Sequence, residues 1–68
     1  MTIMLNGEPK EIAAELSVAG LIAALELTPE RLAIEVNHRI IRRAEWHSTT
    51  LAEGDKVEVV HFVGGGAR

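Results

Sequence analysis

The N-terminal residues carry the pattern of a β-hairpin. A short apolar run over residues 2–6 closes with Asn6-Gly7. Asn-Gly accepts positive φ at both central positions of a two-residue turn, which makes it the strongest local signal for a hairpin. A second strand is expected over residues 9–13. Pro9 should lie at its start or on an edge of the sheet, because proline has no N–H to donate.

The next segment has the period of a helix. Apolar residues recur at i, i+3, i+4 and i+7, which is one helical face: Val18, Leu21, Ile22 and Leu25. Ser17 is the expected N-cap, and Leu16 and Leu21 occupy the two positions of a hydrophobic staple. Gly20 lowers the helix propensity by roughly 1 kcal/mol, so the helix should depend on packing. We expect it to end before Pro29.

Apolar and polar residues alternate in the second half of the chain, as they do in a strand with one buried face. Residues 32–37 predict a half-buried strand whose core face is formed by Leu32, Ile34 and Val36. A turn at His38-Arg39 and a short return strand at residues 40–41 would complete a second hairpin. Residues 42–50 have no clear period but include Trp46, which we expect to fill the core beneath them. After a turn at residues 53–55, the longest strand is expected over residues 56–63.

This order of elements predicts an α+β fold. The expected architecture is a mixed sheet of four to five strands with one main helix across one face. The first and last strands are the most continuously apolar, so we place them at the centre of the sheet, as parallel neighbours. Residues 1–63 would form this domain, and residues 64–68 a flexible, glycine-rich C-terminal tail.

Length and composition narrow the function. The chain has 68 residues, 47% of them apolar, and no cysteine. A domain of this size buries about 60% of the surface of its unfolded chain, which leaves no room for a deep catalytic cleft. We therefore expect no enzymatic activity of its own. The absence of cysteine excludes disulfides and thiolate chemistry and fits a cytoplasmic location. We expect neither a membrane span nor a secretory signal.

The net charge argues against a nucleic-acid partner, and the spacing of the histidines argues against a metal site. The net charge of −3 has the wrong sign for attraction to phosphate, so no nucleic-acid partner is expected. A basic cluster at Arg39, Arg42 and Arg43 could contact an acidic partner or RNA, but it has no aromatic stacking residue beside it, so we favour a solvated turn. The histidines lack metal-ligand spacing, and no metal site is expected: they are His38, His47 and His61.

Three glycines follow the last predicted strand directly: Gly64, Gly65 and Gly66. The fold does not need them, because glycine packs no side chain and loses the most conformational entropy when it is ordered. They are open to two interpretations. One is a free chain end. The other is a narrow lead that enters a partner's active site, where any Cβ would clash; fully extended, it would reach roughly 10 Å.

Four segments carry a family resemblance. In order they are MTIMLNGEP, SVAGLIAAL, AIEVNHRIIRRAEW and LAEGDKVEVVHFVGGG. Together they run from Met1 to Gly66 and resemble the sulfur carrier proteins of thiamin biosynthesis, the ThiS family, which are ubiquitin-like β-grasp domains that end in Gly-Gly. The most particular segment is the Ile-x-Arg-x-x-Trp run that ends at Trp46. The resemblance implies a β-grasp fold for this chain.

The resemblance also implies a protein carrier that is not an enzyme. An adenylyltransferase of the ubiquitin-activating type would use ATP to adenylate the terminal glycine, because a free carboxylate is an anion at neutral pH and a poor acyl electrophile. A sulfur donor system would then replace AMP to give a thiocarboxylate. Thiazole synthase would take that sulfur into the thiazole ring of thiamin. The carrier itself would bind no cofactor, since ATP is used by the activating partner.

By this resemblance Gly66 is the sulfur acceptor, and Gly64 and Gly65 form the lead. The chain departs from the family pattern because Ala67-Arg68 follow, so Gly66 has a peptide carbonyl in place of a carboxylate. Three explanations are open: a protease removes the pair, the pair does not belong to the natural protein, or this homologue carries no sulfur. We favour the first two.

The last strand predicts a partner-binding surface. Its inward side chains would be Val57, Val59, His61 and Val63. Val60 and Phe62 would then be exposed beside Met4 of the first strand, as an apolar patch on a solvated sheet face. Ubiquitin-like proteins use a similar patch for docking. The alternative is that Phe62 folds back into the core.

Two other functions stay open. A different β-grasp sulfur carrier, such as the small subunit of molybdopterin synthase or a carrier for cysteine or tRNA thiolation, would share the tail and differ in its partner. A non-carrier β-grasp binding domain would use residues 64–68 only as a linker. The short length and the Ile-x-Arg-x-x-Trp run favour the thiamin carrier.

Overall fold

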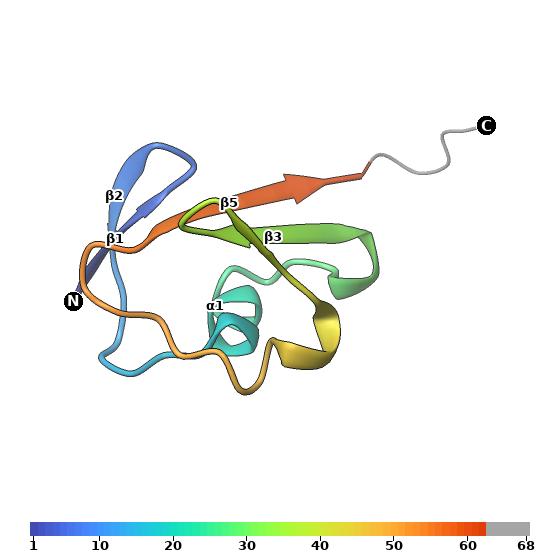
Figure 1. Cartoon of the computed structure of the whole chain (residues 1–68), viewed down its shortest axis with the longest axis horizontal. Coiled ribbons are helices and arrows are strands. Elements are labelled where there is room, and N and C mark those ends of the chain that lie inside the picture. The colour runs from blue at the N-terminus through green and yellow to red at the C-terminus, as the bar shows by residue number, and fades with distance from the viewer. Residues whose placement is uncertain (63–68) are drawn as a thin grey trace.

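The computed structural model describes residues 1–62, which form one sheet with helices on one side (Figure 1). The strands are β1 (Thr2–Leu5), β2 (Glu8–Glu11), β3 (Leu32–Val36), β4 (Arg39–Ile41) and β5 (Lys56–His61). The helices are α1 (Val18–Ala24) and the short 3₁₀ helices η1 (Pro29–Arg31) and η2 (Arg43–Glu45).

The first and last strands occupy the middle of the sheet, whose order is β2-β1-β5-β3-β4. β1 and β5 run parallel, with Met4 opposite Lys56 and Leu5 opposite Val57. The remaining neighbouring strands are antiparallel. α1 crosses one face of the sheet (Figure 1). The predicted α+β architecture, with a parallel central pair and one main helix, is therefore confirmed.

Two tight turns close the hairpins with left-handed residues. Asn6 and Gly7 have φ angles of 49° and 84°, as a primed two-residue turn requires. The second turn uses Asn37 and His38, with φ angles of 51° and 70°, so β4 already begins at Arg39. The predicted turn at His38-Arg39 was wrong by one residue. Asn37 tolerates the left-handed backbone, and its amide oxygen also accepts the Lys56 N–H at 3.0 Å.

The second strand begins and ends earlier than the expected range of residues 9–13. The two-residue turn brings Glu8 directly opposite Leu5, so pairing starts there. Pro9 lies on the edge strand β2, as predicted, where the absence of its N–H does not disrupt hydrogen bonding between the inner strands. Ile12 follows the end of β2 and packs partly buried against the core.

Capping contacts define both ends of α1. The Ser17 hydroxyl accepts the N–H of Gly20 at 3.0 Å, which confirms the predicted N-cap. Beyond the C-terminus, the N–H groups of Glu26 and Leu27 bond back to carbonyls of the last turn at 3.0 and 3.2 Å. This is a Schellman ending, with Glu26 in the left-handed position at a φ of 58°. Within residues 1–62, no helix is long and apolar enough to cross a membrane.

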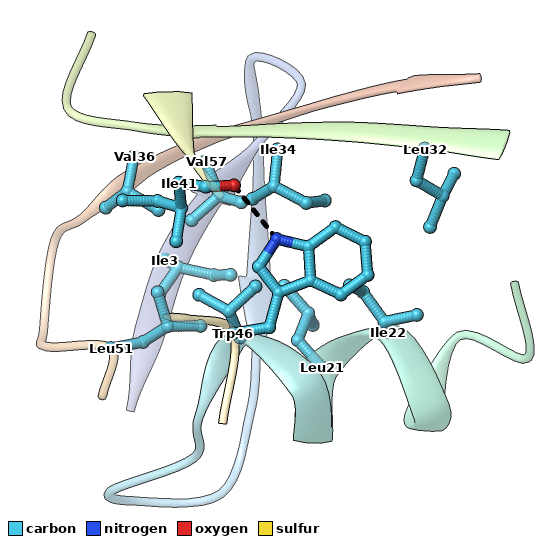
Figure 2. Close-up of a cluster of buried hydrophobic side chains, with 11 residues drawn as sticks. Ile3, Leu21, Ile22, Leu32, Ile34, Val36, Ile41, Trp46, Leu51 and Val57 are labelled. Atoms are coloured by element: carbon cyan, nitrogen blue, oxygen red, sulfur yellow. Dashed lines mark hydrogen bonds between the residues drawn. The ribbon is translucent and has the colours of Figure 1, made fainter. Parts of the chain in front are cut away.

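The core lies between α1 and the sheet, with the indole of Trp46 near its centre (Figure 2). Trp46 is only 5% exposed, and its Nε1–H donates to the carbonyl of Ile41 at 2.9 Å. The Arg43 guanidinium carbon lies 5.5 Å from the centre of the ring. Trp46 therefore fills the core beneath the irregular segment, as predicted. The other buried apolar residues are Ile3, Val18, Leu21, Ile22, Leu32, Ile34, Val36, Ile41, Leu51 and Val57.

Candidate docking face and C-terminal strand

The face of the sheet opposite α1 carries the outward side chains of β5. Val57 is fully buried on the helix side, and alternation directs Glu58 and Val60 to the other face, which we call the outer face. Phe62 continues this alternation one residue beyond β5. Val60 and Phe62 are 53% and 56% exposed. Their predicted exposure is confirmed, and the alternative in which Phe62 folds into the core is wrong.

Met4 also lies on the outer face, but not beside Val60. The parallel register places Met4 opposite Lys56, at the start of β5. Val60 is four residues further along the strand, which corresponds to roughly 13 Å. Met4 is also only half-buried where Val60 is well exposed. The expectation that Val60 and Phe62 lie beside Met4 was therefore wrong, because it lacked the register between the first and last strands.

Ile40 of β4 is an outer-face residue that was not anticipated. It is 70% exposed and lies directly opposite Glu35, which in turn lies opposite Glu58. A shallow hollow of about 140 Å³ runs between these side chains and Val60. Since Ile40 and its buried neighbour Ile41 point to opposite faces, one of them had to meet solvent. That alternation was the available signal.

The charges on the outer face are mostly unpaired within residues 1–62. The one ion pair in this part of the chain joins the N-terminal amine of Met1 to Glu11, 3.6 Å apart. Glu35 and Glu58 face each other with no ion-pair partner there, and Lys56 forms no ion pair with either. The outer face therefore combines exposed apolar side chains with two adjacent carboxylates.

Other predicted candidates are separate from this face. Arg43 is held by its own fold, because its Nη2 donates to the Pro29 carbonyl at 2.8 Å while the guanidinium lies over Trp46. Arg39 and Arg42 are exposed near the second hairpin. Within the described part of the chain, no three acidic or histidine side chains cluster as metal ligands would.

A second hollow, of about 300 Å³, lies between α1 and η2. Its walls are mostly apolar, with Ile22, Leu27 and Trp46 among them, and Arg43 and His47 at its polar side. Its lining does not pair a nucleophile with a base, so the hollow offers mainly apolar contact surface. The sequence pattern contained no signal for it, because its walls come from three separate segments.

The end of β5 is anchored before the glycines begin. The N–H of Phe62 donates to the Arg31 carbonyl at 2.8 Å, which ties the last described residue to the end of η1, directly before β3. The N–H of Val59 donates to the side-chain oxygen of Asn6 at 2.8 Å on the other side of the strand. The predicted lead Gly64-Gly65 and acceptor Gly66 lie outside the described residues, so their roles stay predictions.

A parallel central strand pair, two flanking hairpins and one helix across a single face define a ubiquitin-like β-grasp domain. Comparison with known proteins then identifies the family. The model of the ThiS family matches residues 3–66. The chain belongs to the ThiS family.

Individual relatives agree with this assignment. A crystal structure of the thiamine biosynthesis protein ThiS from Geobacter metallireducens has a TM-score of 0.85 and 35% identity, covering 97% of this chain and all of that one. The sulfur carrier protein ThiS of Bacillus subtilis is 36% identical over 50 residues, 74% of this chain and 76% of its own length. A thiazole synthase of Magnetococcus marinus is 42% identical over 66 residues, 97% of this chain, which spans only 20% of that protein.

Proposed function

We propose that this protein is the sulfur carrier of thiamin biosynthesis and that its sulfur is bound at Gly66. The observation that carries the proposal is the extent of the family match, which runs through the last strand and ends at Gly66. β5 is the central strand and leads directly toward the glycines. The rigid sheet would therefore present a side-chain-free segment to the active site of a partner.

The proposed chemistry takes place on the carboxylate of Gly66 in two displacements. After Ala67-Arg68 have been removed, a carboxylate oxygen attacks the α-phosphorus of ATP and pyrophosphate leaves. Sulfur at the oxidation level of sulfide then attacks the carbonyl carbon and AMP leaves, which gives the thiocarboxylate. An adenylyltransferase of the ubiquitin-activating type binds the ATP, and a sulfur donor system supplies the sulfur. The carrier contributes no catalytic residue, bound cofactor or metal.

Thiazole synthase is the proposed acceptor of this sulfur. A segment similar to nearly the whole chain forms a fifth of the Magnetococcus marinus thiazole synthase, so a β-grasp domain of this kind occurs in one polypeptide with that enzyme. This observation favours the thiamin pathway over molybdopterin synthesis or cysteine and tRNA thiolation. We place the carrier in the cytoplasm, where its proposed partners would use ATP. Docking would use the outer face, with Val60 and Phe62 near the tail and Met4 at its far end.

The test compares chains that differ only at the C-terminus. Protein ending at Gly66 is incubated with the adenylyltransferase, ATP and a sulfur donor, and pyrophosphate exchange and the intact mass are measured. We expect exchange, and a mass increase equal to the replacement of one oxygen by sulfur. The full chain ending at Arg68 is the matched control and should give neither. Equal activation of both chains, or of a Gly66→Ala variant, would contradict the proposal.

A further inference from the structure

The exposed large apolar side chains of residues 1–62 all lie on the outer face of the sheet. Ile40, Val60 and Phe62 are each more than half exposed. Ile40 comes from the edge strand β4, and the other two come from β5 and the residue after it. Ile40 and Val60 border one shallow hollow, and exposed apolar residues that share one sheet face are typical of a protein-binding surface.

Two carboxylates lie in the middle of this apolar surface. Glu35 on β3 is directly opposite Glu58 on β5, and Ile40 is opposite Glu35 on its other side. Residues directly opposite in an antiparallel pair have Cβ atoms about 4.5–5.5 Å apart, and like charges at that distance repel. Since neither carboxylate has an ion-pair partner within residues 1–62, the free protein leaves this repulsion uncompensated.

The chemistry of the surface specifies its occupant. A metal ion would need further ligands, and no group of three candidate ligands exists in the described part of the chain. A guanidinium fits better, because its planar fork can bind two adjacent carboxylates while its flat faces contact apolar side chains. The shallow hollow between Ile40, Val60 and the two glutamates has the matching mixed character.

We propose that thiazole synthase binds the outer face with an arginine that inserts between Glu35 and Glu58, flanked by apolar contacts to Ile40 and Val60. The partner rests on the proposed function and on the similarity of this chain to one fifth of a thiazole synthase polypeptide. The charge of the partner follows from complementarity with the facing carboxylates and with the net charge of −3. The repulsion between Glu35 and Glu58 lowers the stability of the free carrier, and an arginine in the complex would compensate it. Functional sites commonly contain such locally unfavourable arrangements.

The decisive variant is the double substitution Glu35→Gln and Glu58→Gln in the full chain. Removing the repulsion should raise the Tm of the free protein by about 2–4 °C. It should also weaken binding to thiazole synthase, measured by calorimetry, at least about tenfold and abolish most of the salt dependence of that binding. A purely structural role would move stability and affinity in the same direction.

A second double variant, Glu26→Gln with Glu45→Gln, is the matched control. Both residues are exposed and lie next to α1 or in η2, away from the outer face, and the change in net charge is the same. We expect its affinity for the synthase to equal that of the unaltered protein. Charge reversal by Glu58→Lys adds an independent check, because the introduced ammonium group would pair with Glu35 within the carrier and exclude the arginine.

Three outcomes would overturn the proposal. If the Glu35→Gln, Glu58→Gln protein binds the synthase as tightly as the unaltered protein, the carboxylates have no role in docking. The proposed carrier function is unaffected by that result. Normal synthase binding with impaired adenylation, the latter measured on the same variant ending at Gly66, would assign the face to the adenylyltransferase. No binding of the unaltered protein to thiazole synthase would contradict the partner itself, and this result is distinct from a failure of sulfur transfer at Gly66.

Discussion

The indole nitrogen of Trp46 donates a 2.9 Å hydrogen bond to the backbone carbonyl of Ile41, and both residues are buried (Figure 2). The bond joins the end of the edge strand β4 to the residue that caps η2. It thereby orders a segment that has no regular period of its own. A buried carbonyl that loses such a partner keeps the cost of its desolvation.

Trp46→Phe should therefore destabilise the fold. One aromatic ring is retained, but the Ile41 carbonyl loses its donor, so we expect the free energy of unfolding to fall by about 1–3 kcal/mol from the lost bond and further from the unfilled indole volume. Urea denaturation followed by circular dichroism measures this change without relying on tryptophan fluorescence. If Trp46→Phe unfolds at the same urea concentration as the unaltered protein, the bond contributes nothing to stability.

The amide of Asn6 has two structural tasks that two substitutions can separate. The side-chain oxygen of Asn6 accepts the Val59 N–H, and the backbone of Asn6 adopts a left-handed φ of 49° in the turn. Asn6→Gly keeps the turn but removes the acceptor, and should cost about 0.5–1.5 kcal/mol. Asn6→Ala adds left-handed strain and should cost about 1–2 kcal/mol more. Chemical denaturation ranks the two, and faster hydrogen exchange at Val59 in both variants would identify the lost bond. An alanine variant more stable than the glycine variant would contradict this account.

Glu26 is an unfavourable residue for its position, because it adopts a φ of 58° at the C-terminal end of α1. Glycine avoids the steric cost of that conformation. We expect Glu26→Gly to raise the free energy of unfolding by about 1 kcal/mol, measured as a shift of the denaturation midpoint. Glu26→Ala is the control, since it removes the carboxylate and keeps the strain. If both variants are equally stabilised, the gain comes from charge.

Glycine at position 20 lowers the helix propensity of α1, but the side chain of Leu16 occupies the space that a Cβ at this position would need. A Cβ at this position would lie 2.7 Å from Leu16 Cδ1 and 3.3 Å from the Ser17 hydroxyl oxygen. The gain of roughly 1 kcal/mol in helix propensity should be cancelled, so Gly20→Ala should unfold within about 0.5 kcal/mol of the unaltered protein.

A double-mutant cycle identifies the cause of that cancellation. In a Leu16→Ala background the contact is absent, and Gly20→Ala should then stabilise by most of its helix propensity. Thermal denaturation of the four proteins gives the coupling between the two sites. Additive effects of Leu16→Ala and Gly20→Ala would show that the contact is relieved without cost.

The apolar part of the docking face should affect binding and leave stability unchanged. We expect Ile40→Ser and Val60→Ser each to weaken binding to thiazole synthase at least about fivefold, because both side chains border the hollow between the carboxylates. Met4→Ser should weaken binding less, because Met4 is half-buried and lies at the far end of the outer face, opposite Lys56. Calorimetric titration measures affinity, and Tm confirms folding. A Met4→Ser effect as large as that of Val60→Ser would place the interface over the whole outer face.

Element types and the central position of the first and last strands followed from the hydrophobic pattern, whereas the registers between strands did not. Asn6-Gly7, Ser17 and the alternation around Ile34 encode their structures within a few residues, so the hairpin, the N-cap and the half-buried strand were predictable. Registers depend on tertiary pairing. Nothing near Glu35 in the chain shows that Glu58 lies opposite it.

The candidate site shows the same division. The exposure of Val60 and Phe62 followed from alternation along one strand. The contribution of Ile40 was missed because the turn was placed one residue too late, which left the direction of the two isoleucines open. The separation of Met4 from Val60 depended on where the parallel pair begins. The role of Gly66 stays a prediction that rests on the resemblance and the family match.

The order of strands in the sheet has a consequence for synthesis of the protein. β5 joins β1 to β3 and is the last of the strands within residues 1–62, so each earlier hairpin lacks its neighbour until residues 56–61 are available. Folding must therefore wait for long-range pairing with residues 56–61. A ribosome that stops before residues 56–61 releases a chain whose two hairpins cannot join in one sheet, and such a chain is open to proteolysis.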